Sequence, residues 1–104
     1  MKKTLIILIT MLSIGCYSQT YSLLEINAKW NQKNNLQQNK IGGIRINFGW
    51  LEDQPKKMQS KIRSVPILVL FRDGKTIYQW VAGIDFKLQV TEEDFDKVFN
   101  KLNK

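Results

Sequence analysis

The chain has 104 residues and is basic, with 16 lysines and arginines against 9 aspartates and glutamates, and it contains one cysteine and no histidine. A chain of this length forms one domain, since domains commonly contain about 100–150 residues. The lack of histidine and of a second cysteine excludes a zinc site made by protein ligands alone, a Ser-His-Asp or Cys-His catalytic centre and an internal disulfide. We therefore expect no catalytic residue, metal or cofactor.

The start of the chain has the pattern of a secretory signal peptide. Lys2 and Lys3 precede an almost wholly apolar run over 5–15, which is shorter than the about 20 residues needed to span a bilayer. Small and polar residues follow this run. We therefore predict that 1–19 is a signal peptide, that the protein is exported to the periplasm or secreted, and that 20–104 forms its single domain.

Lipid attachment at Cys16 is the alternative. Residues 12–16 resemble a degenerate lipobox, in which the cysteine is acylated and becomes the new N-terminus. The leucine of this motif stands one position too early, so we favour simple cleavage. Under the alternative the protein is a lipoprotein anchored through Cys16, and only then do we expect membrane association. In either case the cysteine lies outside the folded domain.

The first half of the domain predicts two strands and two helices. Apolar and polar residues alternate over 24–30 and again over 44–48, which is typical of half-buried strands. Between them, 31–40 is rich in asparagine and glutamine and predicts a short, weakly anchored helix closed by two glycines at 42–43. A second helix is expected to open at Pro55, a residue favoured in the first helical turn.

The second half predicts a hairpin and a closing helix. An unbroken apolar run over 65–71 has strand length, the Asp-Gly pair at 73–74 is typical of a tight turn, and 76–81 returns as an antiparallel strand. A capping box variant at 91–94 opens a helix that continues with an apolar stripe to 102. The order β-α-β-α-β-β-α makes an α/β fold with a mixed four-stranded sheet and flanking helices.

Three stretches of the chain resemble the thioredoxin family. In 62–75 a Val-Pro pair precedes an apolar strand and an Asp-Gly turn, 27–30 is similar to the strand end before the family's active site, and 91–102 is similar to its closing helix. The resemblance implies the minimal thioredoxin-like fold over most of 23–102. It also implies that Pro66 is the family's cis-proline, which lies against the active site.

The family's redox motif is missing from this chain. The resemblance places Cys-x-x-Cys directly after Trp30, but Asn31 and Asn34 stand at the two cysteine positions. An amide cannot attack a disulfide, so we expect a redox-inactive protein that is not an enzyme. Asn31 is open to two interpretations, an N-cap of the first helix, which we favour, and a ligand contact. Glu25 falls at the position of the family's buried acid, and without cysteines we interpret it as an exposed strand residue.

These residues suggest a binding function at the former active-site corner. The resemblance implies that Trp30, Asn31, Asn34, Val65 and Pro66 lie together there, where the backbone of Val65 would pair with a strand-like peptide. We expect a peptide or protein partner. Two alternatives stay open: a structural or assembly subunit with its contact surface elsewhere, and a thiol-disulfide oxidoreductase that uses its single cysteine or a partner's thiol.

The basic residues do not predict a nucleic-acid partner. They are scattered, and the densest group, at 56–63, is interpreted as a solvated helix face, whereas nucleic-acid binding calls for a basic face interleaved with exposed aromatic residues. Four aromatic residues, Trp50, Tyr78, Trp80 and Phe86, are open to two interpretations, core or surface patch, and because the domain is small we expect them in the core.

Overall fold

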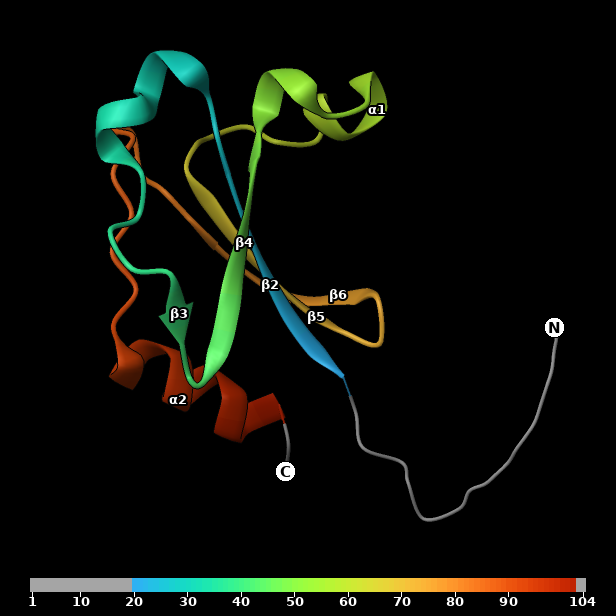
Figure 1. Ribbon diagram of the computed structural model, residues 1–104, viewed down its shortest axis with the longest axis vertical. Helices are drawn as coiled ribbons and strands as arrows, with labels where there is room; N and C mark the ends of the chain where they lie inside the picture. Colours follow the sequence, from blue (N-terminus) through green and yellow to red (C-terminus); the bar gives the residue numbers. More distant parts are fainter. Residues whose placement is uncertain (1–19, 103–104) are drawn as a thin grey trace, which may run out of the picture.

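A single mixed β-sheet organises the chain in the computed structural model, which describes residues 20–102 (Figure 1). The predicted signal peptide and Cys16 lie outside the described residues. Within 20–102 the sheet has five strands in the order β3-β4-β2-β5-β6. Central strand β2 runs parallel to β4 and antiparallel to β5, and β6 is antiparallel to β5. The strands span Tyr21–Asn27 (β2), Lys40–Ile41 (β3), Ile44–Trp50 (β4), Ile67–Arg72 (β5) and Lys75–Val81 (β6).

The α/β class and the mixed sheet agree with the prediction, but the sheet has one strand more than the four expected. The additional strand, β3, pairs Lys40 with Arg45 and Ile41 with Ile44. The chain reverses between them at Gly42 and Gly43, where φ is 57° and 76°. Glycine adopts this left-handed conformation without a steric penalty, so two residues suffice for the turn.

The helix expected over 31–40 does not form. The chain instead makes a short 3₁₀ helix, η2 (Lys29–Asn34), and then reaches β3 through an irregular segment with bends. The amide of Asn27 donates hydrogen bonds to the carbonyl oxygen of Asn31 and to the side-chain oxygen of Asn35. Asparagine amides that bond to nearby backbone compete with regular helix, which is the physical reason for the wrong prediction.

The second predicted helix begins where expected but is much shorter. After a turn of 3₁₀ helix, η3 (Leu51–Asp53), Pro55 caps the single turn α1 (Lys56–Gln59). The chain must then enter β5 through Val65 and Pro66, and a residue before proline disfavours helical backbone. Consequently α1 covers little of the sheet.

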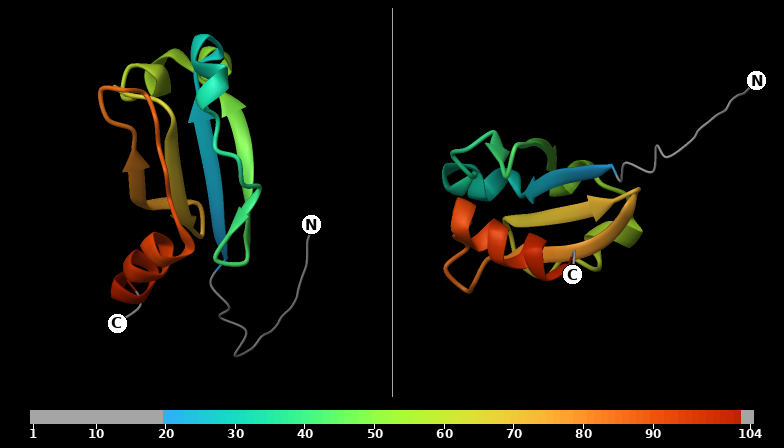
Figure 2. Two further views of the ribbon diagram at one scale, coloured as in Figure 1. Left: turned by 90° about the vertical axis from the view of Figure 1, so that its left-hand side faces the viewer. Right: turned by 90° about the horizontal axis from the view of Figure 1, so that it is seen from below.

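The two faces of the sheet are packed very differently. On β2, Leu23 belongs to the main core cluster with Phe95 of helix α2 (Glu92–Leu102), whereas Ile26 points to the opposite face. That opposite face has a smaller cluster, formed by Ile26, Ile67 and Val69 of β2 and β5. Figures 1 and 2 show η2 and α1 beyond the ends of β2 and β4, and α2 at the other end of the sheet. The central strand therefore has buried residues on both faces, such as Leu23 and Ile26, and not on one face alone as its alternation predicted.

Two local predictions in the second half are confirmed. Asp73 and Gly74 form the two-residue hairpin turn, with φ of 52° and 83°. At the start of α2, the backbone N–H of Asp94 donates to Oγ1 of Thr91 at 3.0 Å, and the N–H of Thr91 donates to Oδ2 of Asp94 at 2.9 Å. The pKa of Asp94 is lowered, first by the hydrogen bond that its carboxylate accepts from the backbone N–H of Thr91 and second by a hydrogen bond with the Thr91 side chain. The two bonds at 3.0 and 2.9 Å are reciprocal. They complete the capping box.

Gly42→Ala tests the packing of the β3–β4 turn on α2. A Cβ at this position would overlap the ring of Phe95, and its φ of 57° strains any side chain. We expect a loss of about 2–3 kcal/mol in the free energy of unfolding, measured by urea denaturation. Gly43→Ala is the matched control, because its φ is 76° but nothing lies within 4 Å of the added Cβ. It should lose only about 1 kcal/mol, and equal losses in the two variants would contradict the packing argument.

Candidate functional site

The residues predicted for the site meet at the end of the sheet where β2 stops and β5 begins. The amide Nδ2 of Asn31 donates to the carbonyl oxygens of Val65, at 3.4 Å, and of Phe86, at 3.0 Å. The Val65–Pro66 peptide bond is cis, as the resemblance implies. Trp30 lies beside them with 64% of its surface exposed. The two predicted segments, 30–34 and 65–66, therefore do meet, and the loop at Phe86, which was not predicted, joins them.

Asn31 is buried at the centre of this corner, with an exposed fraction of 3%. Its Nδ2 also donates to Oδ1 of Asn27 at 3.0 Å, and its Oδ1 accepts a hydrogen bond from Nδ2 of Asn34 at 2.7 Å. Oδ1 of Asn27 additionally accepts the backbone N–H of Ala28 at 2.9 Å. Both ends of the Asn31 amide are thus occupied within the protein.

The interpretation of Asn31 as an N-cap is wrong. Helix η2 begins at Lys29, its N-cap residue is Ala28, and Asn31 lies inside it with non-helical φ and ψ of −110° and 20°. The reason is that the Asn31 side chain bonds to distant segments and to Asn27, and not to the N–H groups of its own helix. Its burial also leaves no surface for a direct ligand contact.

The interpretation of Glu25 as an exposed residue is also wrong, since only 4% of it is exposed. Its side chain lies on the same face of β2 as Leu23, where the segment after η2 crosses the strand. Oε2 of Glu25 accepts the backbone N–H of Leu36 at 2.9 Å. Burial raises the pKa of Glu25, and this hydrogen bond offsets part of the rise. In a central strand that is packed on both faces, residues are buried whichever face they point to. The alternation of apolar and polar residues along one strand does not reveal this.

Val65 and Pro66 are buried as well. The carbonyl of Val65 already accepts the Asn31 amide, so the backbone expected to receive a strand-like peptide lies below the surface. Asn34 is half-buried and lines an open polar depression of about 510 Å³ together with Lys87 and other loop residues. Of the five predicted site residues, Trp30 alone offers a large exposed surface.

Two further residues extend that surface, and sequence reasoning did not identify them as site residues. Phe86, expected in the core, is 38% exposed, and its ring meets that of Trp30 edge to face with 5.0 Å between centroids. Ile84 is 98% exposed. We call Trp30, Ile84 and Phe86 the corner patch. The apolar residues at 84 and 86 follow Gly83 and belong to no helical or strand period, which is the signal that could have placed them in an exposed loop.

A shallow cavity of about 300 Å³ adjoins the corner patch. It is lined by Arg63, Ser64, Ala82, Gly83, Ile84 and Phe86. Oγ of Ser64 donates to the carbonyl oxygen of Gly83 at 3.2 Å. Arg63 is exposed. The corner thus combines apolar rings, a depression and a guanidinium group, which is suited to holding a side chain of a partner.

Over residues 20–102 no group of three or more acidic, histidine or cysteine side chains is placed to hold a metal ion. Within the same range no helix has the length and apolar character needed to cross a membrane.

A comparison with protein-family models finds no match to the chain, and a comparison with curated proteins finds none either.

Asn31→Ala tests the structural role of the buried amide. The variant removes buried hydrogen bonds to Asn27 and to the carbonyl of Val65, together with part-buried bonds to Asn34 and to the carbonyl of Phe86, so we expect the free energy of unfolding to fall by about 2–4 kcal/mol. Gln32→Ala, an exposed position of the same 3₁₀ helix, should change it by less than about 0.5 kcal/mol. Chemical denaturation of both variants gives the comparison, and a neutral Asn31→Ala would show that the amide cluster does not hold the corner.

Glu25→Gln tests the buried carboxyl through pH. Because the pKa of Glu25 is raised in the folded state, folding favours the protonated form. The contribution of Glu25 to stability is therefore full below the ordinary glutamate pKa and is lost as the pH rises through the folded-state pKa. Relative to wild type, Glu25→Gln should gain stability from acidic to neutral pH in urea unfolding experiments. Glu93→Gln, an exposed position on α2, is the control, and parallel pH curves for Glu25→Gln and wild type would refute the assignment.

Proposed function

We propose that this chain is an exported, thioredoxin-like module without redox chemistry, and that it binds a peptide or protein segment at the corner patch. The observation that carries the proposal is the exposure of Trp30, Ile84 and Phe86 together, beside a cavity, in a domain whose other large apolar residues mostly pack into two clusters. Adjacent exposed apolar side chains of this kind are typical of interaction sites.

The strand order supports the thioredoxin-like part of the proposal. Strands β4, β2, β5 and β6 are neighbours in this order, with the first pair parallel and the next two pairs antiparallel. This is the arrangement that the family resemblance implies for the minimal fold. In this comparison β3 is an addition at the edge, and η2 stands where the family has its first helix.

The side chains at the two cysteine positions support a function without redox chemistry. Asn31 and Asn34 touch through their amides, at 2.7 Å, so the positions are adjacent as a redox pair would be. An amide has no thiolate to attack a disulfide. The burial of Asn31 further separates this position from any substrate.

The buried backbone of Val65 changes the expected mode of binding. A partner reaches the side chains of the corner patch and not the strand edge, so we propose that an apolar side chain of the partner packs on Trp30 and Phe86. Arg63 at the adjoining cavity favours an acidic residue next to that side chain. Tryptophan and arginine are the residues that most often dominate the energetics of such interfaces.

Peptide display against the full chain tests the proposal. Selected peptides are expected to carry an aromatic or aliphatic residue beside an acidic one. Their affinity, measured by calorimetry, should fall at least about tenfold for the Trp30→Ala/Ile84→Ser variant, because removal of a central hot-spot residue typically costs about 2 kcal/mol or more. Both substitutions are at exposed positions, so circular dichroism should show an unchanged fold.

Phe48→Ala is the matched control for this experiment. Phe48 is 43% exposed and also makes an edge-to-face ring pair, with Trp50, at another place on the sheet. Its removal should leave peptide affinity unchanged. Equal losses in both variants, or binding that ignores the Trp30→Ala/Ile84→Ser change, would favour a contact surface elsewhere, as expected for an assembly subunit. Reduction of insulin disulfides by the chain would contradict the absence of redox chemistry.

A further inference from the structure

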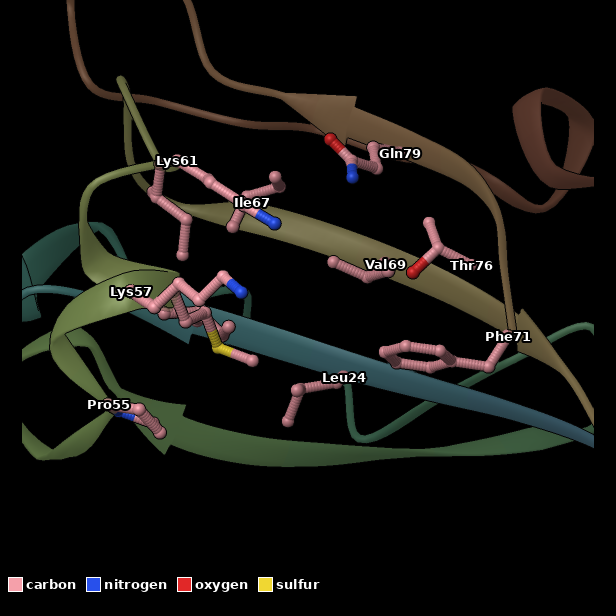
Figure 3. A pocket seen from close by; sticks show the side chains of 12 residues that line it. Leu24, Pro55, Lys57, Lys61, Ile67, Val69, Phe71, Thr76 and Gln79 are labelled. Carbon is pink, nitrogen blue, oxygen red and sulfur yellow. The ribbon is translucent and has the colours of Figure 1, made fainter. Parts of the chain in front are cut away.

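The incompletely covered face of the sheet contains an open apolar groove of about 440 Å³. Its floor is formed by alternate residues of the neighbouring strands β2 and β5, namely Leu24, Ile26, Ile67, Val69 and Phe71. Figure 3 shows these side chains between α1 on one side and Thr76 and Gln79 of β6 on the other. The groove exists because α1 is a single turn and leaves part of this face open. Its volume lies in the range of about 300–1,000 Å³ that small-molecule sites occupy.

The charged side chains that line the groove are both positive. Lys57 and Lys61 are the charged residues among those that line it, and neither makes an ion pair within residues 20–102. Both side chains reach over the end of the groove near Ile67, and Phe71 lies at the opposite end (Figure 3). An occupant with complementary chemistry has an anionic group at the lysine end and an apolar body along the strands.

The shape of the groove selects a narrow occupant. From Ile67 to Phe71 the floor extends four residues along β5, which at about 3.3 Å per residue is about 13 Å. This matches a single extended acyl chain of medium length, and two lysine side chains at the same end of the groove match a carboxylate head group. We propose that this groove binds the carboxylate form of a medium-chain fatty acid, with its head at Lys57 and Lys61 and its tail on Val69 and Phe71. This site is independent of the corner patch, and each can fail without the other.

Calorimetry of the full chain with octanoate, decanoate and dodecanoate, each below its micelle concentration, tests the proposal. Affinity should rise roughly two- to fourfold for each added methylene buried on the groove floor. Dodecyltrimethylammonium, which has the same tail and the opposite charge, should bind much more weakly. Amide chemical shifts should change at Ile67 and Val69 on addition of dodecanoate and stay constant at Trp30 and Phe86. Shifts at the corner patch instead would overturn the proposal.

Two variants sharpen the test. Lys57→Gln/Lys61→Gln should weaken dodecanoate binding roughly five- to tenfold, as expected for two solvent-accessible charge pairs, and raised salt should weaken wild-type binding in the same direction. Lys56→Gln/Lys101→Gln removes the same charge outside the groove lining and should leave the affinity unchanged. Thr76→Trp, which fills the tail end, should abolish the gain from octanoate to dodecanoate.

The remaining outcomes decide against the proposal. If the two lysine double variants lose equal dodecanoate affinity, the attraction comes from the net charge of the protein and not from Lys57 and Lys61. If the cationic detergent binds as tightly as dodecanoate, the groove is a general apolar surface without preference for a carboxylate. Tighter binding of lysophosphatidylglycerol than of dodecanoate would overturn the assignment to a free fatty acid, and dimer formation that excludes dodecanoate would assign the face to a second copy of this chain. Thermal unfolding of each variant, monitored by circular dichroism, confirms that the compared proteins are folded.

Discussion

The hydrogen-bonded asparagine cluster at the end of β2 is the interaction on which the rest of the structure depends. Asn27 terminates the strand and bonds to Asn31, and Asn31 reaches the carbonyl oxygens of Val65 and Phe86. The cluster thus joins the segment after β2, the entry to β5 and the loop before α2. Buried amides must be fully paired to be tolerated, so this junction has essentially one arrangement. The same requirement draws the following chain across β2, where Leu36 donates its N–H to buried Glu25.

The two faces of the sheet differ because the chain supplies them with different numbers of covering residues. On one face, the segment after η2, the loop over 84–90 and α2 together cover the main core, which contains Phe95 and against which Leu36 and Leu88 pack. On the other face the chain has only η3 and the single turn of α1 before it must enter β5 through Pro66. A domain of this size buries a limited share of its surface. The face with fewer covering residues remains a groove.

Local patterns predicted those parts of the fold that local physical chemistry decides. The Asp73-Gly74 turn and the Thr91–Asp94 capping box each depend on a few adjacent residues, and the apolar run of β5 identifies a strand buried on both faces. The sequence predicted that the segments of the site meet, but it did not predict which of their side chains are buried and hydrogen-bonded. Burial of Glu25 and of Asn31 depends on Leu36, Val65 and Phe86, which are distant in the sequence, and no local pattern carries that information. The helix over 31–40 was wrong for the same reason.

Burial and exposure at the corner together separate a structural role from a binding role. A nucleophile at position 31 would have to be reached by its substrate, whereas the Asn31 side chain is buried and both its amide nitrogen and its amide oxygen are hydrogen-bonded inside the protein. Its neighbour Trp30 does the opposite, since its ring contributes mainly exposed surface and one edge-to-face contact with Phe86. Ile84 contributes almost no burial at all. Exposed apolar side chains add little to folding and favour association, so folding stability does not account for the corner patch, which is the reason for proposing it as a binding surface.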